Sequence, residues 1–275
     1  MRTHTMNDGR EIPQIGLGTY GLRGAAGEAQ ISEAIRFGYR LIDTAVRYEN
    51  EEVVGRAVRY CGVDRDDLFV TSKIPGNAHG MRSAVEAVKG SLSRTGLDYL
   101  DLALIHWPNP SQGKFVQAWE GLIHAREQGL VKSIGVSNFL PEHLQQIVAE
   151  TGVKPVLNQV ELNPFFQREE LTRFHAENSI ITECWTPLGR KSDLLSSPTV
   201  LEIAREVHAT PAQVVLRWAV QKNFLPIPKT SQLKRAQENL LVFSWELSEE
   251  HMEQLRMLET GISGFGFDPT THEEY

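Results

Sequence analysis

The stretch LFVTSKIPGNAHGMRSAVEAVKGSLSRTGLDYLDLALIH, residues 68–106, carries the pattern that decides the fold. Residues 68–73 form an apolar run typical of a strand, residues 81–94 have helical spacing, and residues 100–106 are again an apolar, strand-like run. Strands joined through a helix lie parallel to one another, so their ends meet at one edge of the sheet. The stretch therefore predicts a parallel strand pair with Lys73 and His106 at a common edge.

The same alternation of strand and helix extends along the chain in both directions. Apolar runs that we interpret as strands occupy residues 15–18, 40–43, 68–73, 100–106, 133–136, 156–160, 180–184 and 224–227. Helical spacing follows most of them, at residues 28–37, 51–60, 81–94, 115–128, 142–150, 168–178 and 211–221. Eight such units within 275 residues fit a closed (β/α)8 or TIM barrel better than an open sheet, and they predict a single domain over residues 1–275.

Several segments lie outside this repeat. Residues 3–6 and 11–12 flank an Asp8-Gly9 pair, which is a hairpin signal, and such a hairpin before the first strand is placed to cap the bottom of the barrel. Residues 199–207 and 248–258 have the spacing of two extra helices, and the tail at residues 261–275 is expected to be a loop.

Composition excludes several classes of function. A net charge of −7 and a pI near 5.8 argue against a broad surface for nucleic acid. No stretch approaches the ~20 apolar residues of a membrane span, and the N-terminus has no signal core, so we expect a cytoplasmic protein. Cys61 and Cys184 are expected to be small buried apolar residues, and the eight histidines other than His106 lack the spacing of metal ligands.

Four residues of mixed chemistry sit at or just after the ends of predicted strands: Asp43, Tyr48, Lys73 and His106. In a barrel of parallel strands these ends share one rim. An acid, a phenol, an ammonium and an imidazole meeting there would make a site for delivering a proton. Each residue alone also has an ordinary explanation, such as a loop cap for Asp43 or a half-buried aromatic residue for Tyr48.

A glycine motif offers a competing interpretation. Gly16-Leu-Gly18-Thr-Tyr-Gly21 matches G-x-G-x-x-G, and Asp43 ends the next strand where a ribose-binding acid would lie in a doubly wound dinucleotide-binding domain. Gly24 and Gly27, however, fall where the phosphate-binding helix should begin, and glycine inside a helix costs about 1 kcal/mol relative to alanine. We therefore interpret the glycines as turn residues at the end of a barrel strand.

Six motifs occur in order along the chain and together carry a family resemblance. They are Asp43-Thr-Ala-Val-Arg-Tyr48-Glu-Asn50-Glu, Leu104-Ile-His106-Trp-Pro108, Ile134-Gly-Val-Ser137-Asn138, Asn158-Gln159-Val-Glu161, Trp185-Thr-Pro-Leu188-Gly189 and Ile227-Pro-Lys229-Thr230. From residue 7 to residue 248 the chain resembles the aldo-keto reductases, most closely the bacterial branch that includes the 2,5-diketo-D-gluconate reductases.

The resemblance implies a catalytic role for each of the four rim residues. In this family a nicotinamide delivers hydride to a carbonyl carbon, and a tyrosine matching Tyr48 protonates the oxygen. Lys73 would favour proton donation by the phenol, Asp43 would position the ammonium, and His106 would orient the carbonyl by donating a hydrogen bond. A small-molecule aldehyde or ketone is the implied substrate. A non-catalytic, nucleotide-binding barrel remains the alternative, because fold does not determine function.

The later motifs imply NADPH as the cofactor. By resemblance, Ser137, Asn138 and Gln159 would bind the nicotinamide amide, Trp185 would stack on its ring, and the loop at residues 188–192, with Leu188 and Gly189, would follow the pyrophosphate. Two cations and two hydroxyls lie after the eighth strand, where barrels of this type often bind phosphate. The residues implied for the adenosine 2′-phosphate and adenine are Lys229, Thr230, Ser231, Arg235, Glu238 and Asn239.

The sequence indicates the identity of the substrate much less clearly. The predicted pocket draws on Tyr20, Ile74, Trp107 and Asn109, and on the tail around residues 265–267. Many relatives carry Leu-Trp after the catalytic lysine, where this chain has Ile74 followed by proline. An aromatic-lined pocket favours apolar or aromatic aldehydes and ketones. We expect a monomer.

Overall fold

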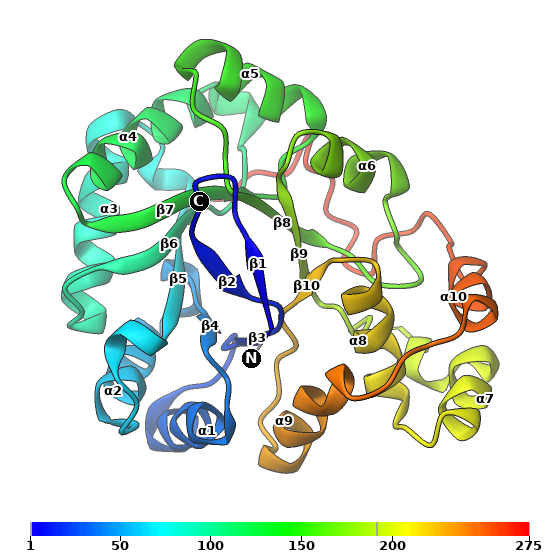
Figure 1. The fold of residues 1–275 in the computed structure, drawn as a ribbon. Coiled ribbons are helices and arrows are strands. Elements are labelled where there is room, and N and C mark those ends of the chain that lie inside the picture. The colour runs from blue at the N-terminus through cyan, green and yellow to red at the C-terminus, as the bar shows by residue number, and fades with distance from the viewer. Residues whose placement is uncertain (1, 191, 275) are drawn as a thin grey trace.

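Eight parallel strands surround a common axis in the computed structural model, which describes residues 2–190 and 192–274 (Figure 1). Each strand pairs with the next one along the chain, and a bridge between Gly18 and Lys229 connects the first strand to the segment that follows the last one. The strands are β3 (Gly16–Gly18), β4 (Leu41–Asp43), β5 (Phe69–Ile74), β6 (Leu100–Ile105), β7 (Val131–Ser137), β8 (Leu157–Glu161), β9 (Ile181–Trp185) and β10 (Leu225–Pro226). The predicted (β/α)8 barrel is confirmed.

Helices follow the strands and form the outer layer of the barrel (Figure 1). In chain order they are α1 (Gly24–Phe37), α2 (Glu51–Tyr60), α3 (Met81–Thr95), α4 (Phe115–Glu127), α5 (Pro141–Thr151), α6 (Glu169–Glu177), α7 (Pro198–Glu206), α8 (Pro211–Gln221), α9 (Leu233–Leu240) and α10 (Glu249–Arg256). The two predicted extra helices are confirmed as α7 and α10. Helix α9 was not predicted; it carries Arg235, Glu238 and Asn239, which we expected only as residues that bind the 2′-phosphate and the adenine.

A hairpin of β1 (Thr3–Thr5) and β2 (Glu11–Pro13) lies across the N-terminal end of the barrel (Figure 1). Its turn is tied to the segments that enter the strands: the Asn7 side chain donates to the Pro155 and Ser179 carbonyls at 2.9 and 3.1 Å. Ile12 is fully buried and packs inside the barrel. The hairpin thus closes the bottom of the barrel, as the Asp-Gly signal predicted.

The strand order rules out the doubly wound alternative. A doubly wound sheet reverses its strand order at a switch point, whereas here the order follows the chain without reversal. The glycine motif is a barrel strand and its following turn. A Cβ atom at Gly18 would lie 2.9 Å from the Ile227 carbonyl oxygen, so Gly18 permits close contact between β3 and the segment around β10.

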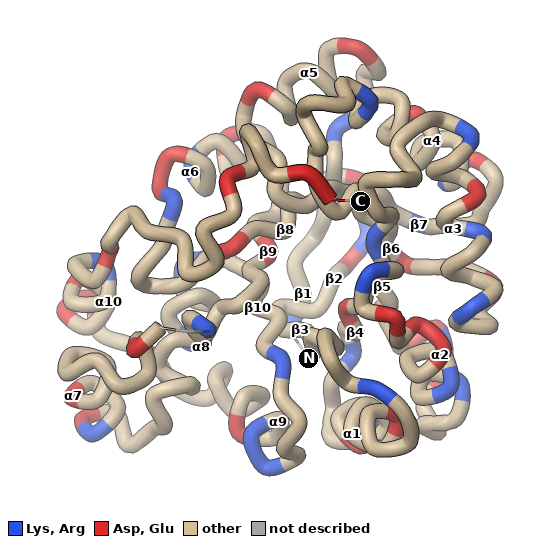
Figure 2. The backbone as a smooth tube through the Cα atoms, turned by 180° about the vertical axis from the view of Figure 1, so that it is seen from behind, with Lys and Arg blue, Asp and Glu red and all other residues tan. Residues whose placement is uncertain are grey.

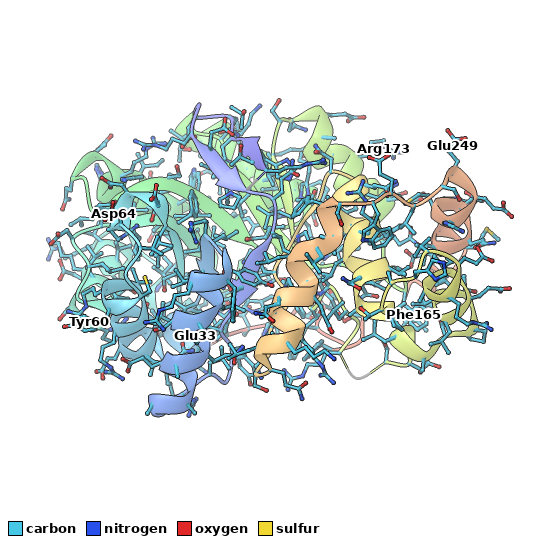
Figure 3. All side chains as sticks on the ribbon, turned by 60° about the horizontal axis from the view of Figure 1, so that its bottom comes forward. Glu33, Tyr60, Asp64, Phe165, Arg173 and Glu249 are labelled. Carbon is cyan, nitrogen blue, oxygen red and sulfur yellow. The ribbon has the colours of Figure 1, made fainter. Side chains whose placement is uncertain are left out.

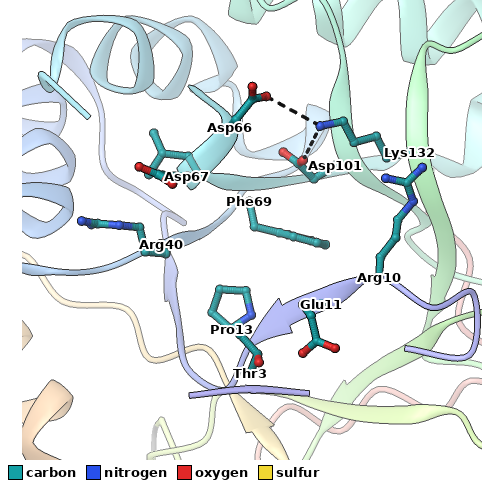
Figure 4. A pocket seen from close by; sticks show the side chains of 11 residues that line it. Thr3, Arg10, Glu11, Pro13, Arg40, Asp66, Asp67, Phe69, Asp101 and Lys132 are labelled. Atoms are coloured by element: carbon teal, nitrogen blue, oxygen red, sulfur yellow. Dashed lines mark ion pairs between the residues drawn. The ribbon is translucent and has the colours of Figure 1, made fainter. Parts of the chain in front are cut away.

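The end of the barrel that carries the hairpin also holds a cavity of about 450 Å³ (Figure 4). One of its basic side chains is paired within the cavity: Lys132 lies 3.7 Å from Asp101 and 4.0 Å from Asp66. Acidic and basic side chains line the cavity in nearly equal numbers, so it has no clear preference for a charged ligand. The four predicted catalytic residues lie at the opposite end, where active sites of such barrels are built.

The helices of the outer layer carry exposed side chains on the outside of the molecule. Side chains such as Tyr60, Arg173 and Glu249 point outward from the helices (Figure 3). Among residues 2–190 and 192–274, none of the helices combines the length and apolar character needed to cross a lipid bilayer.

Candidate active site

The C-terminal ends of three adjacent strands bring the four predicted catalytic residues together. Asp43 ends β4, Lys73 lies near the end of β5, His106 directly follows β6, and Tyr48 lies on a 3₁₀ turn, Val46–Tyr48. The Lys73 ammonium donates to both carboxylate oxygens of Asp43 at 2.7 Å, and its Nζ lies 3.4 Å from the Tyr48 hydroxyl. The Tyr48 and His106 rings meet edge to face with centroids 6.0 Å apart.

Electrostatics keeps the lysine charged and the phenol protonated. Burial alone would lower the pKa of Lys73, but the Asp43 carboxylate reverses this effect and raises it. Burial raises the pKa of Tyr48 to about 12, against the opposing influence of the Lys73 charge. The site therefore holds a protonated phenol beside a fixed cation, which can stabilise the phenolate left after proton donation.

A buried asparagine positions the loop that carries Tyr48. Asn50 precedes α2, and its side chain donates to the Thr19 carbonyl at 2.8 Å and the Leu22 carbonyl at 3.0 Å. Its amide oxygen accepts from the Thr44 hydroxyl at 2.8 Å. The loops after β3 and β4 are therefore held together next to the site.

The residues implied for nicotinamide binding lie on neighbouring strands and are already linked to one another. The Trp185 indole donates to the Asn138 amide oxygen at 2.8 Å, and the Asn138 amide nitrogen donates to Ser137 Oγ at 3.0 Å. Ser137 Oγ donates to the Gln159 main-chain carbonyl at 2.8 Å. This network holds the indole of Trp185 at the rim.

Gln159 also connects this network to the ion pair. Its amide nitrogen donates to Asp43 at 2.9 Å and to Glu183 at 2.7 Å, so both amide protons are used within the protein. Gln159 can therefore address a nicotinamide amide only through its carbonyl oxygen as acceptor.

Glu183 is a buried carboxyl group that the sequence analysis did not identify. It lies on β9, directly opposite Gln159 of β8, and is fully buried. Burial and the nearby Asp43 charge raise the pKa of Glu183 to about 8. An acidic residue within the predicted strand at 180–184 was the available signal, because unpaired carboxylates are rarely buried.

The predicted phosphate-binding residues gather at the start of α9. Lys229, Ser231 and Arg235 are exposed there, and Figure 2 shows this basic segment at α9. The Thr230 hydroxyl accepts from the Gln232 amide at 3.1 Å, which orders the turn into the helix. Exposed cations beside the free N–H groups of a helix N-terminus suit a phosphate.

Glu238 and Asn239, predicted near the adenine, lie on the same helix. The Glu238 carboxylate lies 3.8 Å from Lys234 Nζ, and its main-chain carbonyl accepts from Gln213 at 2.9 Å. Asn239 is buried. Glu238 therefore already contacts residues of α8 and α9, and Asn239 lies in the protein interior.

The loop after β9 lies beside the rim, where it contacts Tyr20 and the tail. Gly189 has a φ of +62°, and Leu188 is half-buried. The Arg190 guanidinium lies 5.4 Å from the Tyr20 ring centroid and 5.9 Å from that of Phe265. Lys191, part of the predicted pyrophosphate loop, lies outside the described residues.

The C-terminal tail covers the predicted substrate side of the site. Phe265 packs edge to face on Trp185 at 5.4 Å between centroids, and Phe267 does so on Trp107 at 5.7 Å. Ser263 donates to the Glu161 carboxylate at 2.6 Å and so fixes the start of this segment to β8. The predicted contribution of the tail to the aromatic lining is consistent with this arrangement.

Of the remaining predicted substrate residues, Tyr20 is half exposed and packs against Tyr48, with centroids 5.2 Å apart. Ile74 is buried at the end of β5. The Asn109 side chain pairs with the main chain of Glu274, donating at 2.6 Å and accepting at 3.1 Å. Asn109 thus binds the tail, and it would influence substrate binding only by positioning the tail.

The tail also brings a second unexpected carboxylate to the site. Glu274 Oε1 lies 2.7 Å from His106 Nδ1, with the two side chains only 9% and 13% exposed. Nothing in the sequence pattern pointed to this contact, because Glu274 follows a tail without helical or strand periodicity.

Comparison with known proteins shows the family to which the chain belongs. The chain matches the model of the aldo/keto reductase family over residues 14–260. It is 53% identical over 272 residues to 2,5-diketo-D-gluconic acid reductase B of Corynebacterium sp. (strain SHS752001), covering 99% of this chain and 98% of the relative. An aldo-keto reductase of Mycolicibacterium smegmatis (strain ATCC 700084 / mc(2)155) is 44% identical, over 97% of this chain and 96% of its own.

Solved structures give the same result. A variant of Gox0644 in complex with NADPH superposes with a TM-score of 0.94 at 40% identity, covering 99% of this chain and 98% of that one. An aldo/keto reductase from Brucella melitensis has a TM-score of 0.90 at 42% identity, covering 94% of this chain and 99% of that one. Family model, sequence relatives and structures agree, and this chain belongs to the aldo/keto reductase family.

Proposed function

We propose that this enzyme reduces aldehydes or ketones to alcohols with NADPH, and that Tyr48 supplies the proton. The observation that carries the proposal is the grouping of Tyr48, His106 and the Lys73–Asp43 ion pair at one barrel rim. When bound, the nicotinamide supplies a hydride to the carbonyl carbon. The carbonyl oxygen takes a proton from the Tyr48 hydroxyl, so the C=O bond becomes CH–OH and the cofactor is oxidised to NADP⁺.

The role of Lys73 follows from the charge that the proton transfer leaves behind. Once Tyr48 has given up its proton, the phenolate is stabilised by the ammonium 3.4 Å away. Asp43 keeps that ammonium protonated and fixed, with a further bond from Lys73 to the Thr44 carbonyl at 2.9 Å. His106 would donate to the substrate oxygen and direct it toward Tyr48.

NADPH fits the rest of the rim. The flat Trp185 indole, held by Asn138, offers a stacking surface for the nicotinamide. Lys229, Thr230, Ser231 and Arg235 at the start of α9 would bind the 2′-phosphate, for which an arginine fork is well suited. Glu238 and Asn239 would border the adenine.

The substrate class is proposed from the lining and from the relatives. Trp107 and the tail aromatics favour carbonyl compounds with apolar or aromatic groups. The Corynebacterium relative is named for a diketo sugar acid, so a keto sugar acid belongs in the same test panel. The monomeric state, the single-domain organisation and a cytoplasmic location remain predictions from the sequence.

The test is to follow NADPH absorbance with a panel of aldehydes, ketones and keto acids, comparing wild type with Tyr48→Phe. Because the variant loses the proton donor but keeps the ring, we expect kcat to fall about 100- to 10,000-fold with NADPH affinity preserved. Tyr60→Phe, an exposed tyrosine on α2, is the matched control and should behave as wild type.

Two results would contradict the proposal. Full activity in Tyr48→Phe would remove Tyr48 as the acid. Absence of turnover by wild type across the whole panel, with NADPH still bound, would favour the non-catalytic nucleotide-binding barrel.

A further inference from the structure

Two carboxyl groups share the side-chain amide of Gln159, and only one of them, Asp43, belongs to the proposed catalytic group. We propose that the other, Glu183, is a positioning residue for the cofactor: by accepting one amide proton of Gln159, it keeps the Gln159 amide oxygen turned toward the nicotinamide carboxamide. This inference rests on the proposed function, because it concerns how Gln159 meets the cofactor.

Strand register places Glu183 beside Gln159. The two residues lie directly opposite each other on β8 and β9, so their side chains leave the sheet on the same side. The preceding residues, Asn158 and Thr182, turn the other way, and both bond to His175 of the outer helix α6. Gln159 and Glu183 therefore point into the barrel, where each is at most 1% exposed.

The amide nitrogen of Gln159 is anchored at two points inside the barrel. It donates to Asp43 Oδ2, which comes from β4, at 2.9 Å and to Glu183 Oε2 at 2.7 Å. Exchanging the amide nitrogen and oxygen would turn an acceptor toward an Asp43 oxygen that itself accepts from Lys73, so the orientation of the amide is determined. A single bond would leave the amide free to turn about that bond, whereas two bonds in different directions fix its plane.

This arrangement leaves the amide oxygen of Gln159 available as an acceptor. Among residues 2–190 and 192–274, no group donates to Gln159 Oε1. Other residues proposed to bind the nicotinamide are close by: Ser137 Oγ bonds to the main-chain carbonyl of Gln159 at 2.8 Å, and Trp185 follows Glu183 by two positions on β9. A fixed amide oxygen at this place suits an N–H group of a carboxamide.

Glu183 can serve as the acceptor in either ionisation state. An ionised carboxyl group has two acceptor oxygens, and a protonated one still has a carbonyl oxygen. Within the part of the chain that the structure describes, its other oxygen, Oε1, is buried without a hydrogen-bond partner, and its side chain bonds only to Gln159. A buried polar group that is only partly satisfied is a cost to the fold, and its one bond is to the residue that would meet the cofactor.

The experiment compares Glu183→Met, which removes the acceptor, with Glu183→Gln, which keeps a carbonyl oxygen at similar volume. The first readout is solvent exchange of the Gln159 side-chain NH₂ protons in the cofactor-free protein, assigned by the NMR signals lost in Gln159→Met. We expect both protons to exchange slowly in wild type and Glu183→Gln, and one to exchange about 10-fold faster in Glu183→Met. The wild-type measurement tests the anchoring of the amide even where Glu183→Met does not fold.

The second readout is the Kd for NADPH and for 2′-phospho-ADP-ribose, measured by calorimetry. This fragment keeps the 2′-phosphate and the pyrophosphate but lacks the nicotinamide. Loss of one oriented hydrogen bond should weaken NADPH binding about 3- to 10-fold in Glu183→Met and leave binding of the fragment within about twofold of wild type. Glu183→Gln should restore the NADPH affinity to within about twofold of wild type.

Several results would overturn the inference. They are fast exchange of either Gln159 amide proton in wild type, unchanged NADPH affinity in Glu183→Met, equal weakening of NADPH and the fragment, and NADPH binding by Glu183→Gln that is as weak as in Glu183→Met. Failure of the proposed function is a separate result: a wild type that binds NADPH but reduces no carbonyl compound would contradict the reduction and leave the test of Glu183 intact.

Discussion

At the scale of single residues, the site depends on how four buried polar side chains share their charges. Lys73 and Asp43 form an ion pair that is completely enclosed, and Gln159 connects this pair to Glu183. Enclosed charges are costly unless they are paired and hydrogen-bonded. Asp43 meets this requirement through Lys73 and Gln159, whereas Glu183 stands beside a negative charge and is therefore neutral near pH 7.

Glu183 makes stability depend on pH in a predictable direction. In the unfolded chain its pKa has the ordinary value of about 4.5, whereas burial beside Asp43 raises the pKa of Glu183 to about 8 in the folded protein. Between these values unfolding releases a proton, so the free energy of unfolding of the wild type falls as the pH rises from 5 to 8. Glu183→Gln removes this release while keeping an acceptor for Gln159.

We therefore expect the stability of Glu183→Gln relative to wild type to improve by at least about 1.4 kcal/mol between pH 5 and pH 8, the value of one pKa unit. Urea unfolding at both pH values measures this difference. Glu202→Gln, at an exposed position on α7, is the control and should show no such trend. A difference between Glu183→Gln and wild type that is the same at both pH values would mean that Glu183 is ionised in the fold.

The sequence predicted the positions of site residues where local pattern and strand end coincide. Asp43, Lys73 and His106 end apolar runs, so parallel topology alone places them at one rim. Glu274 could not be predicted in this way, because its place depends on the path of a tail that has no periodicity. The bonds of Gln159 were equally hidden, since they depend on strand register.

At the scale of helices and strands, the largest difference from prediction is around β10 and α9. The predicted strand at 224–227 is reduced to Leu225–Pro226, because Pro226 and Pro228 have no N–H group to donate to a neighbouring strand. Helix α9 then begins within the basic segment, where two cations and few apolar residues conceal the helical spacing. The predicted phosphate residues thus lie at a helix N-terminus and the turn before it.

Packing between helices can be tested at two glycines. Gly55 of α2 faces α3 so closely that a Cβ atom would lie 1.9 Å from the Thr95 carbonyl oxygen. At Gly90 of α3 the nearest atom to an added Cβ is the flexible end of Arg94, at 3.0 Å. Alanine in a helix is otherwise favoured over glycine by about 1 kcal/mol.

We expect Gly55→Ala to destabilise the protein by about 1 to 3 kcal/mol, because the helix backbones must separate. Gly90→Ala should be neutral or up to about 1 kcal/mol more stable than wild type. Urea midpoints of the two variants decide between packing and helix propensity. Equal effects of the two substitutions would show that α2 and α3 do not depend on close contact at Gly55.

At the scale of the whole molecule, the two ends of the barrel serve different purposes. The hairpin, with Ile12 in the core and Asn7 at the strand entries, closes one end. The tail covers the other end through Glu161, Asn109 and its aromatic side chains. Between the ends, the barrel closes where β3 meets the segment after β10, and this same segment carries Lys229 and leads into α9.

Closure of the barrel and cofactor binding should therefore be coupled at Gly18. Its amide donates to the Pro228 carbonyl at 3.1 Å, and a side chain there would meet the Ile227 carbonyl oxygen. We expect Gly18→Val to force this junction apart, lowering the free energy of unfolding by about 1 to 3 kcal/mol and weakening NADPH binding together with it.

Arg235→Ala, which changes only an exposed side chain on α9, should weaken NADPH binding by about 10-fold or more without loss of stability and with little effect on NADH. Urea unfolding and cofactor fluorescence titration measure the two properties separately. If Gly18→Val destabilises the protein but binds NADPH as wild type does, the junction is structural only, and if Arg235→Ala keeps its NADPH affinity, the 2′-phosphate is bound elsewhere.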